Sequence, residues 1–291
     1  MYVQILDYND ILKNPYLLSN SFRETGFAVI KNHDVDPKLV QKVYDQWESF
    51  FKLPLEEKNK YKFNQNRQDG YFPFKSENAK GSTAKDLKEF YHIYKNSELP
   101  SNFYTYTNDL FSVCETKNLM KTLTDLGESL LVALDVVNFK ENVVKNTQPF
   151  SKMIENSDQT LFRILHYPPI IENPDGAVRA AAHEDINLIT LLPSSTFPGL
   201  QVKDIQGNWH FVDLDNTENA IIVNVGDMLQ EASNGYYKST THRVVNPTGY
   251  GATISRYSMP LFIHPRPSVK LSERYTAEEY LNERLQELGL K

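Results

Sequence analysis

Cysteine is almost absent from this sequence of 291 residues, in which Cys114 stands alone. A single cysteine cannot form a disulfide within the chain, and disulfides are typical of secreted proteins. We expect Cys114 to be a small buried apolar residue in a helix, not a nucleophile. Residues 1–8 also lack the basic segment followed by an apolar one that marks a secretory signal. These absences favour a cytoplasmic protein.

Long apolar runs and clusters of one charge are missing as well. No apolar stretch reaches the roughly 18–20 residues that a helix needs to span a bilayer. Lys and Arg number 31 against 37 Asp and Glu, which gives a formal net charge of −6 without any basic run. We therefore expect neither a membrane nor a nucleic acid as a partner, which leaves a small molecule as the natural ligand.

The residues that are present suffice for a full core, because 40% are hydrophobic and 12% aromatic. Asp36 and Pro37 predict the start of a helix that ends before Leu53-Pro54. A second helix is expected over residues 108–135, where leucines recur on one stripe. Between them, residues 58–83 form a long irregular segment, which is either a lid over a pocket or a surface excursion.

The pattern changes at about residue 158, where alternating apolar and polar residues predict strands. Short strands separated by turn residues are expected at residues 26–31, 85–94, 161–167, 186–192, 200–203, 209–212, 220–224, 242–245 and 252–259. Many short strands at close spacing predict a sandwich or barrel and argue against a parallel α/β sheet. A helix capped by Thr276 and Glu279 closes the chain. We predict a mainly β protein with flanking helices, in which residues 1–157 pack on a catalytic core of residues 158–291 as one structural unit.

Three polar residues have the types and spacing of a metal site. Residues i and i+2 of a strand share a face, so His183 and Asp185 are expected to point into one pocket while Glu184 points away. The best third ligand is His242. Two histidines and one carboxylate on one side of a metal form the facial arrangement of non-haem Fe(II) oxygenases. A hydrogen-bonded strand histidine remains the alternative for His183 alone.

A second pair, Arg256 and Ser258, is also expected to share one face of a strand. The planar guanidinium of Arg256 binds a carboxylate through two hydrogen bonds, and Ser258 adds a hydroxyl donor. A dicarboxylate could therefore chelate a metal at one end and contact this pair at the other. The alternatives are an ordinary ion pair for Arg256 and a solvated strand residue for Ser258.

Together these motifs resemble the isopenicillin-N-synthase-like family of Fe(II)- and 2-oxoglutarate-dependent oxygenases. The order His183-x-Asp185, His242, Arg256-x-Ser258 matches that family. Flanking segments agree as well: Gly199-Leu200-Gln201-Val202, Asn224-Val225-Gly226-Asp227 and Asp86-Leu87-Lys88-Glu89. The resemblance covers nearly the whole chain and implies a double-stranded β-helix (jelly-roll) core with the metal at one mouth.

The resemblance also implies roles for individual residues. His183, Asp185 and His242 correspond to the iron ligands, and Arg256 and Ser258 to the pair that binds the distal carboxylate of 2-oxoglutarate. Tyr167 matches a tyrosine that often contacts this cosubstrate, whereas Leu165 departs from the asparagine common in plant members. The implied reaction oxidises a C–H bond of a small molecule by hydroxylation, desaturation or ring closure. It uses O₂, with ascorbate as a reductant, and releases succinate and CO₂.

Substrate residues are expected in the segment 58–83 and near it. Arg67 could bind the carboxylate of an amino acid or another small acid, with Tyr71 beside it, although a solvated loop arginine is the alternative. Wall residues are expected at Phe74, Tyr91 and Phe262. Two other functions stay open, namely an oxidase of the same fold that does not use 2-oxoglutarate and a non-catalytic jelly-roll binding protein.

Overall fold

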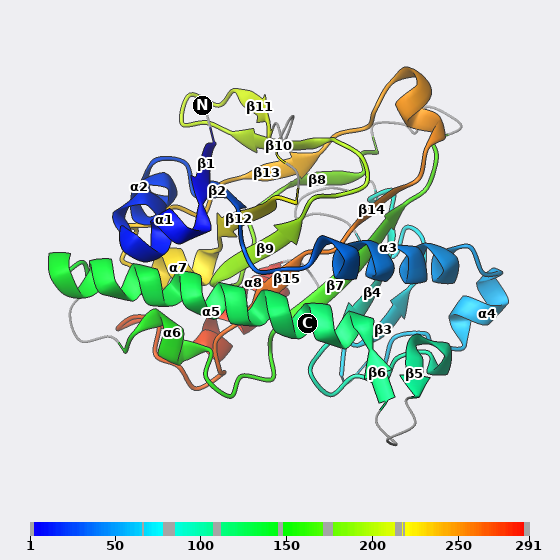
Figure 1. Ribbon diagram of the computed structural model, residues 1–291, viewed down its shortest axis with the longest axis horizontal. Helices are drawn as coiled ribbons and strands as arrows, with labels where there is room; N and C mark the ends of the chain where they lie inside the picture. Colours follow the sequence, from blue (N-terminus) through cyan, green and yellow to red (C-terminus); the bar gives the residue numbers. More distant parts are fainter. Residues whose placement is uncertain are drawn as a thin grey trace.

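The computed structural model describes residues 3–65, 67–77, 85–106, 112–144, 148–170, 177–212, 217 and 219–287. Most of its strands belong to two sheets (Figure 1). The larger has nine strands in the order β1-β2-β12-β9-β15-β7-β4-β3, with β14 also paired to β7, and the smaller has the order β11-β10-β13-β8. The strands are β1 Gln4–Asp7, β2 Phe27–Lys31, β3 Gly70–Phe72, β4 Glu89–Ile93, β5 Tyr104–Tyr106, β6 Ser112–Cys114, β7 Leu161–Tyr167, β8 Ala180–His183, β9 Ile189–Pro193, β10 Leu200–Lys203, β11 Trp209–Phe211, β12 Ile221–Val225, β13 His242–Val244, β14 Arg256–Ser258 and β15 Leu261–Ile263.

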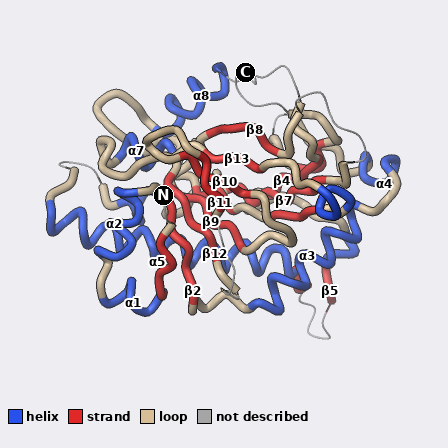
Figure 2. The backbone as a smooth tube through the Cα atoms, turned by 90° about the horizontal axis from the view of Figure 1, so that it is seen from above, coloured by secondary structure: helices blue, strands red, loops and turns tan. Residues whose placement is uncertain are grey.

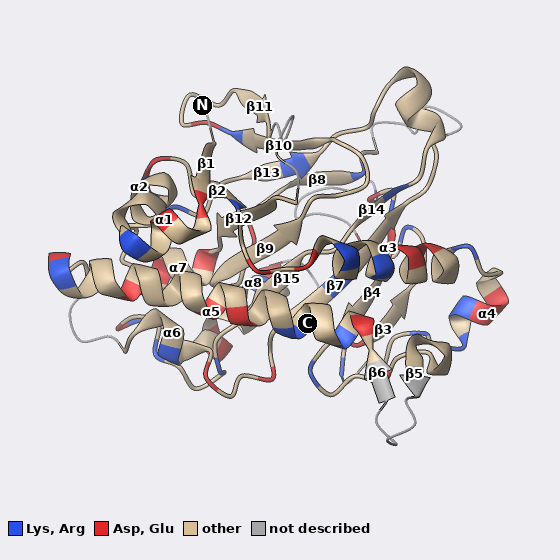
Figure 3. Cartoon of the chain, in the orientation of Figure 1, with Lys and Arg blue, Asp and Glu red and all other residues tan. Residues whose placement is uncertain are grey.

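Helices flank the sheets, as the sequence predicts. They are α1 Tyr8–Lys13, α2 Tyr16–Glu24, α3 Pro37–Phe51, α4 Leu55–Asn59, α5 Glu115–Glu141, α6 Phe150–Met153, α7 Asp227–Ala232 and α8 Ala277–Glu287. Figure 2 shows α3 and α5 along one side of the strands and α8 on the opposite side. Acidic and basic residues are interspersed along α3, α4 and α5 (Figure 3). Among the helices of the described ranges, none is long and apolar enough to cross a membrane.

Helix α3 follows its sequence signals closely. The Asp36 side chain accepts a hydrogen bond from the backbone N–H of Lys38, and Pro37 lies in the first turn. The aromatic face of the helix is buried. Helix α5 differs from the prediction, because it begins at Glu115 and continues to Glu141. Cys114 is buried, as expected, but it ends strand β6 and does not lie in a helix.

The N-terminal half contributes strands to the large sheet. Strand β2 pairs antiparallel with β12, and β4 pairs antiparallel with β7. The segment 58–83 is less irregular than predicted, because β3 lies within it and pairs with β4, placing Tyr71 opposite Tyr91. Gly70 begins β3 with φ +107°, a conformation that favours glycine. Residues 66 and 78–83 of the segment lie outside the described residues.

The expected strand through Asp185 is interrupted between His183 and Ile189. Strand β8 ends at His183 in the smaller sheet, and β9 begins at Ile189 in the larger one. Between them the Asp185 carbonyl accepts from the backbone N–H of Asp227, and the Asn187 side chain donates to the Ile189 carbonyl. Because these bonds replace strand pairing, the chain crosses from one sheet to the other here. The expected strand 252–259 is likewise shorter, since a 3-10 turn occupies Gly249–Thr253.

Candidate functional site

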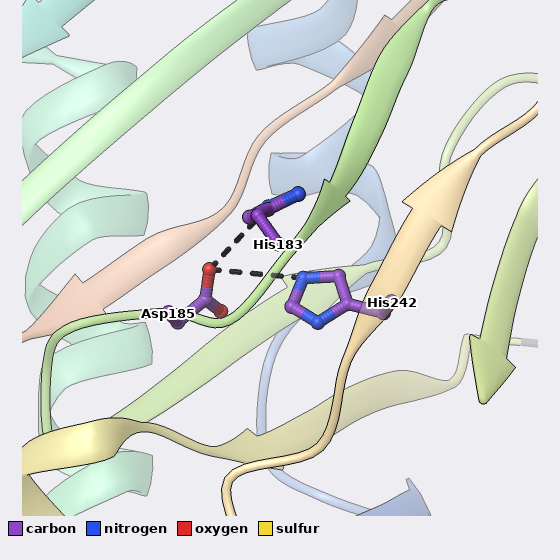
Figure 4. Close-up of side chains that lie close together, drawn as sticks. All are labelled: His183, Asp185 and His242. Atoms are coloured by element: carbon purple, nitrogen blue, oxygen red, sulfur yellow. Dashed lines mark ion pairs between the residues drawn. The ribbon is translucent and has the colours of Figure 1, made fainter. Parts of the chain in front are cut away.

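His183, Asp185 and His242 converge on one point between the two sheets (Figure 4). His183 and His242 lie opposite each other on the paired strands β8 and β13, and Asp185 approaches from the crossing loop. The Oδ1 atom of Asp185 is 3.8 Å from Nε2 of His183 and 3.7 Å from Nε2 of His242. One ligand atom from each residue lies within 4.8 Å of the others, so the group could hold a metal ion.

The two imidazoles are oriented by backbone carbonyls. Nδ1 of His183 is 2.8 Å from the Ala181 carbonyl oxygen, and Nδ1 of His242 is 3.1 Å from that of Thr240. Each carbonyl accepts a hydrogen bond from the Nδ1–H group, which leaves Nε2 as the lone-pair donor. The tautomer that metal binding needs is therefore set by the backbone.

The carboxylate of Asp185 is buried and held from behind. Its Oδ2 atom accepts hydrogen bonds from the Thr190 hydroxyl at 2.6 Å and the Asn224 amide at 2.8 Å, so Oδ1 faces the histidines. Burial opposes ionisation, but His242 and His183, together with these two hydrogen bonds, hold the pKa of Asp185 below its ordinary value. Asp185 is thus an ionised carboxylate at neutral pH, the form that binds metal.

Arg256, Ser258 and Tyr167 line the same cavity as the three potential ligands. Strands β14 and β7 pair so that Arg256 lies opposite Tyr167. Arg256 is only 1% exposed. Its Nε donates to the Phe197 carbonyl at 2.8 Å and its Nη2 to the Ser195 hydroxyl at 2.9 Å, whereas Nη1 has no hydrogen-bond partner in the part of the chain that the structure describes. A buried donor without a partner is costly, so the cavity suits an anion at this position.

Of the five residues expected to contact substrate, Phe262 lines the cavity and the other four do not. Arg67 is an exposed loop residue whose Nε contacts Asp69 at 3.2 Å, and Phe74 is 44% exposed. No described residue of the expected lid segment, 58–77, lines the cavity.

Tyr71 and Tyr91 belong to the core instead. The Tyr71 hydroxyl donates to the buried carboxylate of Glu89, and the Tyr91 ring packs 4.9 Å from that of Trp47. Neither tyrosine lines the cavity, because pairing of β3 with β4 places both in the aromatic cluster under α3.

Two basic residues that we did not expect in the site, Arg163 and Lys88, do line the cavity. Both are balanced by acidic groups: Lys88 contacts Glu77 at 2.8 Å and Asp86 at 2.9 Å, and Arg163 contacts Glu77 at 3.3 Å. The strand alternation of residues 161–167 carried a signal for Arg163, since it shares a face with Tyr167. Local sequence carried no comparable signal for Lys88.

Family models and relatives agree with this site. The model for the N-terminal region of "non-haem dioxygenase in morphine synthesis" matches residues 16–111, and that of the 2OG-Fe(II) oxygenase superfamily matches residues 158–265. A 2-oxoglutarate-Fe(II) type oxidoreductase of Aspergillus fumigatus is 31% identical over 260 residues, covering 83% of this chain and 73% of its own length. The chain belongs to the 2OG-Fe(II) oxygenase superfamily.

Solved structures extend the likeness to the whole fold. A candidate oxygenase from Shewanella oneidensis is 43% identical with a TM-score of 0.83, and the match covers 100% of both chains. A full-length Neurospora crassa protein solved with alpha-KG and thymine is 26% identical with a TM-score of 0.78, covering 98% of this chain and 96% of its own. The predicted jelly-roll core with flanking helices is confirmed. This protein is an Fe(II)- and 2-oxoglutarate-dependent dioxygenase that uses O₂.

Proposed function

We propose that this dioxygenase oxidises a C–H bond of a small molecule by hydroxylation, desaturation or ring closure, and releases succinate and CO₂. The observation that carries the proposal is the shared cavity. His183, Asp185 and His242 meet on one side of it, and Arg256 offers a buried donor without a partner to the same space. A metal and an anionic cosubstrate would therefore share this cavity.

In this proposal His183, Asp185 and His242 hold Fe(II). The residues present fit the ion, because two neutral imidazole nitrogens and one ionised carboxylate are the donor set of non-haem Fe(II) sites. Bound Fe(II) supplies the activation of O₂ that C–H oxidation requires. Thr190 and Asn224 keep the Asp185 carboxylate aimed at the ion.

The cosubstrate is bound by the opposite wall of the cavity. Arg256 and Ser258 hold the distal carboxylate of 2-oxoglutarate, with Tyr167 beside them. The Nη1 group of Arg256 is the donor that remains available, since Nε and Nη2 already bond to the protein. These two bonds fix the guanidinium plane, so the donor is oriented before the ligand arrives.

The substrate is proposed to contact Phe262 and Arg163. The Arg163 guanidinium lies 5.5 Å from the Phe262 ring centroid, so a charged donor and an apolar surface are adjacent. This combination suits a small carboxylic acid, an amino acid or a flat polar ring. Arg163 thereby replaces Arg67, which lies outside the cavity.

A screen for succinate release tests the proposal. Amino acids, small carboxylic acids and pyrimidines would be supplied with Fe(II), 2-oxoglutarate and ascorbate. We expect one class to stimulate succinate release with a matching amount of oxidised product. Oxygen consumption independent of 2-oxoglutarate would identify an oxidase instead. Turnover that needs no metal would contradict the assigned ligands.

Paired variants test the substrate side. Arg163→Met should lower kcat/KM for the substrate found in the screen, because it removes the charged donor from the cavity wall. Arg67→Met is the matched control and should leave kcat/KM unchanged. Equal effects of the two substitutions would refute the assignment of Arg163.

A further inference from the structure

Arg179 is a fully buried cation that the reaction described above leaves unused. It lies directly before β8 and is 0% exposed. Its backbone N–H donates to the Asn246 side chain at 2.9 Å, and its Nη2 donates to the Ile254 carbonyl at 3.0 Å. Its Nε and Nη1 atoms have no hydrogen-bond partner among the described residues.

Arg179 and Arg256 lie close to the same aromatic ring. Their guanidinium carbons are 6.0 Å and 5.1 Å from the ring centroid of Tyr167. Burial, with repulsion from Arg256 added, lowers the pKa of Arg179 to about 10, so both arginines remain charged at neutral pH. Two positive charges are therefore buried around one tyrosine.

No acidic residue of the described ranges forms an ion pair with either arginine. Arg256, Lys88 and Arg163 line the cavity, whereas Arg179 lies near the ring of Tyr167 and does not line it. Lys88 and Arg163 differ from the two unpaired arginines, because both contact Glu77. Buried charges are normally paired, since an unpaired one loses its hydration without compensation. Arg179 and Arg256 have no acidic partner among the described residues, so an anion bound at Arg256 would compensate charge that the protein leaves unpaired there.

We propose that Arg179 is a positioning residue of the cosubstrate site, a second cation that makes the cavity select a 2-oxo acid with a distal carboxylate. This inference rests on the proposed function, which places that carboxylate at Arg256. Arg179 acts through the electrostatic potential and through the ring of Tyr167, which both guanidinium groups approach.

Removing the charge should therefore have two effects of opposite sign. Arg179→Met deletes a buried cation that forms no ion pair within the described ranges, so the ligand-free protein should unfold at the same temperature as the wild type or higher. The same substitution should weaken binding of the dicarboxylate. A residue with only a structural role would lower the melting temperature and leave ligand selectivity unchanged.

The experiment compares two ligands in the full chain loaded with Mn(II), so that no turnover occurs. Calorimetric titration would measure Kd for 2-oxoglutarate and for 2-oxopentanoate. The second acid has the same number of carbons but a methyl group in place of the distal carboxylate. We expect Arg179→Met to reduce the preference for 2-oxoglutarate by about tenfold or more, the scale of one charge contact in a protein interior. Arg179→Lys, which keeps the charge, should retain most of the preference.

Further variants distinguish a folding defect from a failure of the inference about Arg179 and from a failure of the assignment of Arg256. Arg179→Gln removes the charge but can still bond to the Ile254 carbonyl, so it gives the same test if the methionine variant does not fold. Arg243→Met removes a cation of β13 whose guanidinium lies 4.0 Å from the ring centroid of Trp209 and not beside Tyr167, so it should leave the preference unchanged. A wild-type preference in Arg179→Met or Arg179→Gln overturns the inference. If Arg256→Met also keeps the preference, the carboxylate assignment itself is wrong.

Discussion

Thr190→Val should weaken metal binding although Thr190 touches no metal in the proposed site. Its hydroxyl donates the shorter of the two hydrogen bonds to Asp185 Oδ2, at 2.6 Å, and the other comes from Asn224 at 2.8 Å. Valine has nearly the same shape, so the packing is kept while the donor is lost. The carboxylate is then free to turn, and its ionised form loses a charge-assisted bond.

The size of the effect follows from that bond. Hydrogen bonds to charged groups contribute roughly 1.5–3 kcal/mol, and the loss of a supporting partner typically costs about 10- to 100-fold in metal affinity. We therefore expect Thr190→Val to raise the Kd for Mn(II) by about tenfold or more, because Asn224 still supports the carboxylate. Competition with a fluorescent chelator would measure this Kd.

Thr116→Val provides a matched control. Thr116 is also buried, and its hydroxyl accepts from the Trp47 indole at 3.1 Å, far in sequence from the site. This substitution should lower stability without changing the Kd for Mn(II). If Thr190→Val binds Mn(II) within twofold of the wild type, the supporting role of Thr190 is refuted.

Two other predictions concern the cosubstrate and the pH. Arg256→Met should raise the Kd for 2-oxoglutarate by roughly 10- to 150-fold, the equivalent of about 1.5–3 kcal/mol, and calorimetric titration would measure it; a change below threefold contradicts the contact. Burial, then repulsion from Arg163, holds the pKa of His92 well below its ordinary value. The unfolded chain therefore takes up this proton first, and the free energy of unfolding should fall as the pH drops below about 6.5. Urea unfolding at several pH values would show this decline, and a decline equally steep in His92→Gln would contradict it.

Local sequence patterns were sufficient to predict the strands that carry Tyr167, His242 and Arg256. Alternation placed Tyr167 on its strand, and the i, i+2 rule placed Arg256 and Ser258 on one cavity wall. The same rule predicted that His183 and Asp185 lie close together, and they do. Its premise that both residues belong to one strand fails, because β8 ends at His183. Asp185 reaches the site from a crossing loop that contacts the start of α7, and such a long-range contact leaves no local periodicity.

The proposed substrate wall could not be predicted in the same way. Lys88, directly before β4, and Arg163 on β7 line the same cavity because these strands pair, and neither segment alone predicts its partner strand. Nothing in the local sequence predicts that Arg179 is buried. Its burial depends on Asn246 and Ile254, which follow it by more than sixty positions.

Decarboxylation of 2-oxoglutarate in two neighbouring variants tests the identity of the site most directly. Asp185 faces the histidines, whereas the adjacent carboxylate of Glu184 accepts a hydrogen bond from the Thr241 hydroxyl. With Fe(II), O₂ and substrate, we expect Asp185→Ala to release no succinate above background and Glu184→Ala to release it at close to the wild-type rate. Succinate release by Asp185→Ala at the wild-type rate would show that these three residues do not hold the catalytic iron.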